Sequence, residues 1–495
     1  MAEKNYLAVD IGASSGRHIL GHIHDQHLQL EETYRFENGM VDMGGTLYWD
    51  APALWKHIQN GIRQSAAISR EIVSIGVDTW GVDFALLDKA GHLLSNPVAY
   101  RDHRTDGMPE AAFEQVSRET IFAQTGLQFM QFNTLYQWIV MRRSGDPLLE
   151  MAHHFLQIPD LFHWLLSGEY INEFTNATTT QFFQPQTGTW AFDLLKAFDL
   201  PTHFLGEVTP PGTNLGGLRP ALEKDLGVSM NVVLPGTHDT ASAVLAVPAQ
   251  SKPGEKPNWC YISLGTWALM GIESPQPIIN QRVADLNFTN EGGVGNTYRV
   301  LKNITGMWIL QECRRIWNQS GKNWSWGDLT AMAEAVPPLQ SFIDPEAKAF
   351  FAPENMVTAI QEFCLQTGQK VPQTEGEILR CAMDSIAMRF RQVFQMCEEI
   401  NESRIETIHI VGGGTQNHSL CQAAANATGR MVITGPIEAT AIGNILMQAI
   451  ADGVVSDIQE ARQMVRNSFP MEVFMPQDTD RWEEGYRQYR QKSAA

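Results

Sequence analysis

The chain has 495 residues, 43% of them hydrophobic and 18% charged, a composition typical of a packed globular protein. Its 36 basic and 55 acidic residues give a formal net charge of -19, a field that repels nucleic acid and anionic membrane surfaces. Because one hydrophobic core rarely serves a chain of this length, we expect two domains of similar size.

The N-terminal segment and the cysteine spacing indicate the cellular compartment of the protein. The N-terminal segment MAEKNYLAVDIG enters a strand-like run at once, without the basic and apolar regions of a leader, and no later stretch reaches the length of a membrane span. The six cysteines are scattered and include no CxxC pair, which favours free thiols in a reducing compartment. Cys364 and Cys381 are close enough in sequence to be linked if oxidised. We expect a cytoplasmic protein.

The first part of the chain alternates strand-like and helical patterns. Residues 6–12 alternate in polarity as a strand does, and the segments RHILGHI, HLQLEETYRF and TLYWD repeat that pattern between turn residues. This predicts an antiparallel meander. Asp50 can cap a helix over 51–68, and a further strand is expected to begin at Ile72. Strands joined by helices indicate an α/β architecture.

A comparable cycle begins near residue 260, where CYISLGTWALMGI predicts a second hairpin centred on glycine. The segment 378–400 has helical periodicity and leads into the strand-like TIHIVGG. Between the two cycles, 246–258 is rich in Pro, Lys and Gly and suits a surface crossing. We therefore predict domains at 1–247 and 248–495. After about residue 455 we expect a short strand and a polar helix that packs over the second domain.

The segment from Asp10 to Arg17 follows the first strand and consists mainly of small residues. Small residues let backbone amides approach phosphate oxygens, Asp10 can hold hydrated Mg²⁺, and Arg17 adds a fixed positive charge. An ordinary hairpin turn is the alternative, and the segment alone does not decide between the two. The chain contains no GxxxxGK[ST] loop.

Three further groups of residues could carry chemistry. In VGGGTQN, residues 411–417, three glycines precede a helix expected to begin near Asn417, and either a bound ligand or close packing of strand and helix accounts for them. In GTHDTASA, residues 236–243, a carboxylate and an imidazole could orient and deprotonate a hydroxyl, or Asp239 could cap the next helix. The strings DTWGVDF, YRDHRT and FNTLYQ either build a sugar site or supply buried structural hydrogen bonds.

Taken in chain order, these strings resemble the FGGY carbohydrate kinase family. The resemblance runs from about residue 6 to about residue 450 and rests on VDIGASSGR, DTWGVDF, FNTLYQ, TNATTTQ, GTHDTASAV, SLGTWALMG, VLKNITGMWILQE, HIVGGGTQN and GPIEATAIGN. It implies an α/β, actin-like ATPase fold of two ribonuclease-H-like domains with an interdomain cleft. It also implies transfer of the γ-phosphoryl group of ATP, with Mg²⁺, to the 1-hydroxyl of a small ketose, and the strings favour L-rhamnulose.

The resemblance also implies roles for single residues. Asp239 would accept the proton of the attacking hydroxyl. The sugar would be bound by Gly81, His238, Asp239, Thr240 and Asn303. ATP would be bound by Ala13, Ser14, Ser15, Gly16, Arg17, Thr266, Gln311 and Gly413.

Two alternatives stay open. Another ketose, such as L-fuculose or L-xylulose, differs from L-rhamnulose by groups that only pocket geometry discriminates. An actin-like protein could instead use a nucleotide to gate binding without transferring phosphate, but it would not need Asp239 beside a polar, aromatic-lined first domain, and both are present. We therefore expect a kinase whose partners are a ketose and ATP.

Overall fold

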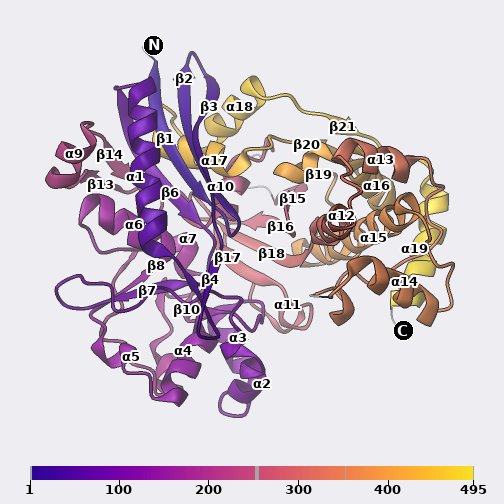
Figure 1. Ribbon diagram of the computed structural model, residues 1–495, viewed down its shortest axis with the longest axis horizontal. Coiled ribbons are helices and arrows are strands. Elements are labelled where there is room, and N and C mark those ends of the chain that lie inside the picture. The colour runs from indigo at the N-terminus through magenta and orange to yellow at the C-terminus, as the bar shows by residue number, and fades with distance from the viewer. Residues whose placement is uncertain (1–2, 251–255, 352, 494–495) are drawn as a thin grey trace. The chain divides into compact units, whose positions relative to one another are not determined.

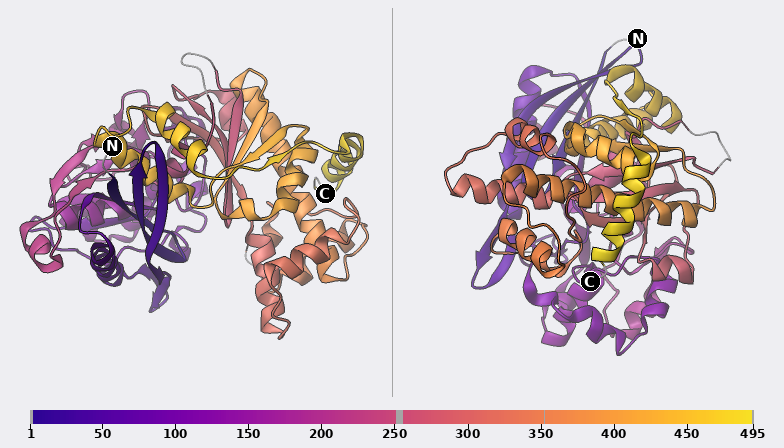
Figure 2. Two further views of the ribbon diagram at one scale, coloured as in Figure 1. Left: turned by 90° about the horizontal axis from the view of Figure 1, so that it is seen from above. Right: turned by 90° about the vertical axis from the view of Figure 1, so that its right-hand side faces the viewer.

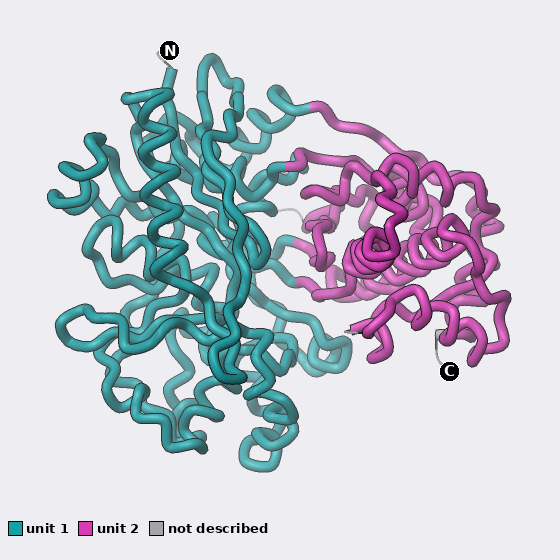
Figure 3. Tube along the Cα trace, in the orientation of Figure 1, with its two compact units in different colours: residues 1–250, 273–300, 438–469 teal, residues 251–272, 301–437, 470–495 magenta. Residues whose placement is uncertain are grey.

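The computed structural model describes residues 3–250, 256–351 and 353–493. The chain forms two compact units, coloured separately in Figure 3: the first has residues 1–250, 273–300 and 438–469, and the second has residues 251–272, 301–437 and 470–495. The chain thus returns twice to the first unit, and the sequence domains 1–247 and 248–495 stay a prediction. Residues 251–255, at the centre of the surface crossing predicted over 246–258, lie outside the described residues.

The core of the first unit is a six-stranded sheet with the order β13-β14-β6-β1-β2-β3 (Figure 1). The first three strands form antiparallel pairs, which confirms that part of the predicted meander, and β6 runs parallel to β1. The strands are β1 (Lys4–Ile11), β2 (Ser15–His24), β3 (His27–Glu37), β6 (Ile72–Thr79), β13 (Asn214–Gly217) and β14 (Asn231–Val233).

The prediction that TLYWD continues the meander is wrong. This segment forms β5 (Thr46–Trp49), which pairs with β4 (Met40–Met43) in a separate hairpin. Gly44 and Gly45 between the two strands have φ of 69° and 89°, so the chain turns back on β4 instead of reaching β3.

α1 (Ala51–Ile68) lies where the sequence predicts it. The side chain of Asp50 accepts a hydrogen bond from Ala53 N at 3.0 Å, which satisfies one of the free amides of the first turn. Leu54, Ile58 and Ile62 are buried on one face, against β2 and β3. Burial of each such side chain contributes roughly 1.5–3 kcal/mol, so this apolar face holds α1 on the sheet.

Two helices from distant parts of the chain pack closely together in the first unit: α10 (Asp239–Leu245) and α17 (Ala439–Ala451). A Cβ atom at Gly443 would lie 1.8 Å from Ser242 O, so only glycine permits this approach. α17 also reaches the sheet, where Asn444 Nδ2 donates to Gly76 O at 3.1 Å. The return of the chain at residue 438 therefore places α10 as well as α17.

Short elements surround β7 (Phe84–Leu87) and β8 (His154–Gln157), which pair antiparallel. The other strands of the first unit are β9 (Asn172–Glu173), β10 (Phe183–Gln184), β11 (Thr189–Trp190), β12 (Val208–Thr209) and β17 (Thr289–Gly292). Its other helices are α2 (Met108–Phe113), α3 (Arg118–Thr125), α4 (Thr134–Ser144), α5 (Leu148–Met151), α6 (Ile158–Ser167), α7 (Phe174–Ala177), α8 (Phe192–Ala197), α9 (Pro220–Leu226), α11 (Gln281–Asp285) and α18 (Ile458–Ser468).

The strand order in the second unit is β18-β16-β15-β19-β20-β21, and residues 273–274 of β16 and 298–300 of β18 belong to the first unit. β15 and β16 form the predicted hairpin, and β15 runs parallel to β19, the predicted strand TIHIV. The strands are β15 (Trp259–Leu264), β16 (Trp267–Ser274), β18 (Tyr298–Thr305), β19 (Thr407–Val411), β20 (Met431–Thr434) and β21 (Val473–Phe474).

The helices of the second unit also follow the sequence pattern. α15 (Glu375–Asn401) contains the predicted segment 378–400, and α16 (His418–Thr428) begins directly after Asn417. The expected C-terminal strand and polar helix are β21 and α19 (Thr479–Ser493), and α19, yellow in Figure 2, packs against α15 and α16. The other helices are α12 (Trp308–Gln319), α13 (Trp326–Glu334) and α14 (Met356–Gln366).

All six cysteines are buried and free. The sulfur atoms of Cys364 and Cys381 lie 4.0 Å apart, so the two thiols are neighbours without a bond between them. Among the described helices, none combines the length and the apolar composition that a membrane span requires.

Glu173 joins two segments of the first unit. Its Oε2 atom accepts hydrogen bonds from the amide and hydroxyl of Thr175, at 2.9 and 2.6 Å, and from those of Thr237, at 3.3 and 2.6 Å. The side chain is fully buried. Glu173 therefore ties the segment TNATTTQ to the segment that leads into α10.

Replacing Glu173 by alanine would leave these buried donors without their acceptor. Because an unsatisfied buried polar group costs about 1–3 kcal/mol, we expect Glu173→Ala to lower the free energy of unfolding by at least that amount. Thermal unfolding of the purified protein measures the loss. Glu169→Ala, at a nearby exposed position, is the control. Equal unfolding midpoints for the two variants would contradict this role of Glu173.

Candidate active site

Two aspartates lie side by side on paired strands of the first unit. Asp10 in β1 and Asp78 in β6 are partners in the parallel register, and both side chains are buried. Asp78 Oδ2 accepts a hydrogen bond from Asn444 Nδ2 at 2.5 Å, while Oδ1 has no hydrogen-bond partner among the described residues. Burial, and after it the charge of Asp10, raises the pKa of Asp78 well above its usual range. Ionisation of both carboxyl groups therefore requires a compensating positive charge.

Arg17 supplies positive charge beside Asp10. It lies opposite Asp10 in the β1–β2 pair, and its Nε and Nη2 donate to Asp10 Oδ2 at 3.0 and 2.8 Å. Its Nη1 lies 2.6 Å from Glu438 Oε2, at the start of α17. The contact with Glu438 is an ion pair, since Glu438 Oε2 accepts no hydrogen bond among the described residues. Of the five N–H donors of a guanidinium, three therefore remain after the two hydrogen bonds to Asp10. Glu438 lies within GPIEATAIGN, but no role was predicted for it, because a partner so distant along the chain leaves no local signal.

The predicted phosphate contacts Ala13 and Ser14 lie in the turn between β1 and β2, and Ser15 and Gly16 are the first residues of β2. Gly12 N donates to Ser15 O at 2.9 Å and closes a tight hairpin. A Cβ atom at Gly16 would lie 2.1 Å from the ring of Phe36, so packing alone already requires this glycine. Contact of the turn with phosphate stays a prediction.

The loop after β6 holds Gly81 beside a strained residue. Val82 has φ of 68°, which a β-branched residue rarely adopts. Its amide donates to Thr179 Oγ1 at 3.0 Å, and its carbonyl accepts from Thr134 Oγ1 at 2.6 Å. A Cβ atom at Gly81 would lie 2.9 Å from the side chain of Thr179. The loop is therefore held in one conformation, with no room for a larger residue at position 81.

His238, Asp239 and Thr240 lie at the start of α10. His238 occupies the N-cap position and Asp239 is the first helical residue, so the alternative that Asp239 caps the helix is wrong. Asp239 Oδ1 accepts hydrogen bonds from Thr240 N at 2.6 Å and Thr240 Oγ1 at 3.1 Å, and 33% of its side chain is exposed. The carboxyl group is thus oriented and still accessible.

The charge of Asp10 acts on two neighbouring carboxyl groups, those of Asp78 and Asp239. Burial, and to a smaller extent the charge of Asp10, raises the pKa of Asp239, while His238 and the hydrogen bonds of Thr240 oppose that rise. The charge of Asp239 in turn contributes to the raised pKa of Asp78. Asp10 pairs with Asp78 in the sheet, and the next residue, Thr79, forms a β-bridge with His238, so the predicted base and the predicted metal-binding aspartate lie in the same part of the first unit. No role was predicted for Asp78, which lies within DTWGVDF.

The predicted nucleotide contacts of the second unit gather around the β15–β16 hairpin. Thr266 Oγ1 donates to Gln311 Oε1 in α12 at 3.2 Å. Gly413 begins the short turn after β19 that packs against β15. Asn303, a predicted sugar contact, lies half-buried in β18 of the same unit.

The three consecutive glycines differ in their conformation and surroundings. Gly412 has φ of 90°, a conformation that favours glycine. A Cβ atom at Gly414 would lie 2.2 Å from the side chain of Leu264, so this position is fixed by packing of the turn on β15. Gly413 is exposed, and a Cβ atom there would meet nothing within 4 Å. Close packing thus explains Gly414, and neither reason explains Gly413.

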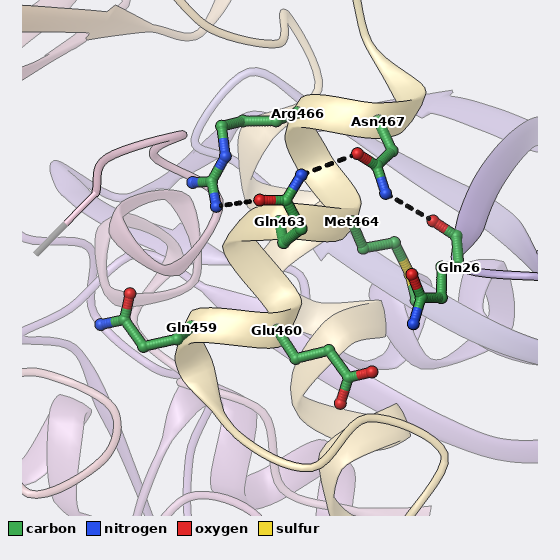
Figure 4. Close-up of a pocket in the computed structure, with 7 residues that line it drawn as sticks. All are labelled: Gln26, Gln459, Glu460, Gln463, Met464, Arg466 and Asn467. Atoms are coloured by element: carbon green, nitrogen blue, oxygen red, sulfur yellow. Dashed lines mark hydrogen bonds between the residues drawn. The ribbon is translucent and has the colours of Figure 1, made fainter.

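A separate groove of about 340 Å³ lies over α18 in the first unit (Figure 4). Its polar side chains bind one another: Arg466 Nη2 donates to Gln463 Oε1 at 2.7 Å, and Gln463 Nε2 donates to Asn467 Oδ1 at 2.8 Å. The groove contains none of the predicted site residues; it is lined by Gln26, Gln459, Glu460, Gln463, Met464, Arg466 and Asn467.

The chain belongs to the FGGY family of carbohydrate kinases. The N-terminal domain of that family matches residues 5–246, and its C-terminal domain matches residues 260–451. The chain is therefore a carbohydrate kinase, and the family implies ATP as its co-substrate. The two-unit α/β architecture is the actin-like ATPase fold that the sequence predicted.

Individual relatives are similar over nearly the whole chain. A rhamnulokinase from Oceanobacillus iheyensis is 43% identical over 468 residues, covering 94% of this chain and 97% of its own length. A rhamnulokinase from Bacteroides thetaiotaomicron is 43% identical over 485 residues, covering 98% of each chain. Among solved structures, a xylulose kinase from Lactobacillus acidophilus superposes with a TM-score of 0.81 at 15% identity, covering 99% of this chain and 97% of that one. At that identity the likeness shows the fold alone.

The different surroundings of Gly413 and Gly414 predict different outcomes for the same substitution. Gly414→Ala forces a methyl group into Leu264, and such overpacking typically costs about 1–3 kcal/mol. Gly413→Ala places its methyl group in open space, so we expect a change within about 0.5 kcal/mol. Chemical denaturation of both variants measures these free energies. Equal losses would show that the turn is constrained at Gly413 too.

Proposed function

We propose that this protein transfers the γ-phosphoryl group of ATP to the 1-hydroxyl of L-rhamnulose, giving L-rhamnulose 1-phosphate and ADP. The observation that carries the proposal is the 43% identity to rhamnulokinases over at least 94% of the chain. A small ketose and ATP, rather than a polyanion, also suit a net charge of -19. The proposal places the reaction in the cytoplasm.

Asp239 is the proposed proton acceptor. Its carboxyl group is oriented by Thr240 and remains 33% exposed, as contact with a substrate hydroxyl requires. General-base assistance is worth roughly 10²–10⁴-fold, and in phosphoryl transfer positioning of the hydroxyl matters at least as much. Gly81, His238, Thr240 and Asn303 are the proposed sugar contacts, with the rigid loop at Val82 keeping Gly81 in place.

Asp10 and Asp78 fit the needs of Mg²⁺. Their oxygens are hard ligands, and Asp78 Oδ1 is buried without a hydrogen-bond partner in the described part of the chain. Among the described residues, no group of three or more His, Cys, Asp or Glu side chains is arranged to hold a metal ion by itself. Mg²⁺ commonly keeps several waters and takes one or two carboxylates plus phosphate oxygens. When bound, it would neutralise charge on the phosphates, and Asp10 would hold it through water.

The ATP contacts that the family resemblance implies stay proposals. Thr266, Gln311 and Gly413 would line the nucleotide site. In the first unit, residues 13–16, from the β1–β2 turn and the start of β2, would present their amides to phosphate oxygens. Arg17 would use N–H groups that its two hydrogen bonds to Asp10 leave free, so it can bind phosphate without giving up that carboxylate.

The other ketoses are the remaining enzyme alternatives. Several solved structures with this fold are xylulose kinases, but their identity to this chain is only 14–17%. Identity near 40% to rhamnulokinases outweighs that likeness. A nucleotide-gated binding protein without transfer would have no use for an oriented, accessible carboxylate at position 239.

A panel of ketoses tests the substrate. We expect ATP consumption with L-rhamnulose at a kcat/KM at least about ten times that with L-fuculose or L-xylulose, because a site built to bind a given hydroxyl rejects sugars in which it is missing or misplaced. ADP release is measured with each sugar and without sugar. A higher kcat/KM for either competitor would reassign the substrate, and sugar-independent ATP hydrolysis alone would exclude a kinase.

Asp239→Asn tests the proton acceptor. The amide keeps the size of the side chain but cannot accept the proton, so we expect kcat to fall by roughly 10²–10⁴-fold while the Kd for ATP changes little. Asp193→Asn, at an exposed position in the first turn of α8, is the matched control. Unchanged turnover in Asp239→Asn would remove this residue from the mechanism.

A further inference from the structure

A buried charged pair lies directly behind His238. Arg299, at the start of β18, is completely buried, and Glu291 in β17 is 6% exposed. Arg299 Nη2 lies 3.0 Å from His238 Nδ1 and 3.3 Å from Glu291 Oε2. Burying two charges costs desolvation free energy that their mutual attraction often does not recover. This pair is therefore more readily explained by a function than by stability.

Arg299 is fixed by a hydrogen bond to the backbone of β17. Arg299 Nε donates to Gly292 O at 2.9 Å, and Gly292 N donates to Thr178 Oγ1 at 2.7 Å. Although burial favours the neutral form of Glu291, the charge of the neighbouring Arg299 helps to lower the pKa of Glu291. Glu291 is thus a carboxylate that balances the guanidinium, and Arg299 cannot turn away from the imidazole.

The chemistry of Arg299 decides which nitrogen of His238 carries the proton. A guanidinium only donates hydrogen bonds, so the nitrogen that it approaches must accept. Nδ1 is that nitrogen, and a neutral imidazole then carries its proton on Nε2. Nε2 lies 3.4 Å from Asp239 Oδ1. Glu291 Oε2 would favour the opposite tautomer, but it lies 3.4 Å from Nδ1, farther than Arg299 does.

We propose that Arg299 and Glu291 are positioning residues that hold His238 as its Nε2–H tautomer, so that this proton faces the carboxylate of Asp239 and the sugar hydroxyl beside it. The inference rests on the proposed function in taking Asp239 as the proton acceptor. In the other tautomer, His238 would present a lone pair to Asp239 Oδ1, and the repulsion would turn the carboxyl group from the attacking oxygen.

The tautomer can be read in the unaltered protein. The nitrogen chemical shifts of a ¹⁵N-labelled histidine distinguish a protonated ring nitrogen from an unprotonated one, and His238→Gln assigns the resonances. We expect His238 to show an unprotonated Nδ1 and a protonated Nε2 at neutral pH. A proton on Nδ1, alone or together with one on Nε2, would overturn the proposal. This spectrum is independent of any activity assay, so its failure is distinct from a failure to phosphorylate L-rhamnulose.

Kinetics of a double-mutant cycle test the consequence. Arg299→Met removes the donor, and we expect kcat to fall about 10- to 100-fold with little change in KM for ATP. Arg299→Lys keeps a donor and should recover part of the loss. In the His238→Gln background, where an amide N–H replaces Nε2–H and no Nδ1 exists, Arg299→Met should have little further effect on kcat. An equal loss in both backgrounds would mean that Arg299 acts only on the fold. If Arg299→Met does not fold, the spectrum of the unaltered protein decides alone.

Discussion

Three carboxyl groups share a small part of the first unit, and like charges so close cannot ionise together unless other groups compensate them. Arg17 pairs with Asp10, Asn444 donates to Asp78, and Thr240 donates twice to Asp239. The pairing of the strands places the groups that must compensate one another side by side. The antiparallel return of β2 brings Arg17 opposite Asp10, and the parallel pair of β1 and β6 brings Asp78 beside it.

The same requirement gives a physical reason for the discontinuous first unit. Residues 438–469 leave the second unit and return to the sheet, carrying Glu438 to Arg17 and Asn444 to Asp78. Residues 273–300 also return, and they carry Glu291 and Arg299 to His238. Each return of the chain thus delivers polar side chains to a group of the candidate site that the first 250 residues could not satisfy alone.

Local signals predicted the elements and the residues that lie within a single motif. α1 followed from its capping residue and apolar face, and the hairpins followed from alternation interrupted by glycine. TLYWD was misplaced because two glycines at positive φ redirect the chain, and a sequence does not show to which strand it turns back. No role was predicted for Glu438, Asn444, Glu291 or Arg299, because their partners lie far along the chain. Only the register of the sheet and the packing of α17 reveal these contacts.

Because α10 and α17 approach each other closely, Gly443 can affect the reaction although it has no side chain. Gly443 lets the backbone at Ser242 pass within a distance that no other residue allows, and α10 begins with the proposed proton acceptor. A substitution at Gly443 would have to tilt α10 and shift the carboxylate of Asp239. The sequence would still contain every polar residue of the site. Relatives could therefore lose transfer through a change remote from both ligands, and a comparison of site residues alone would judge such a relative intact.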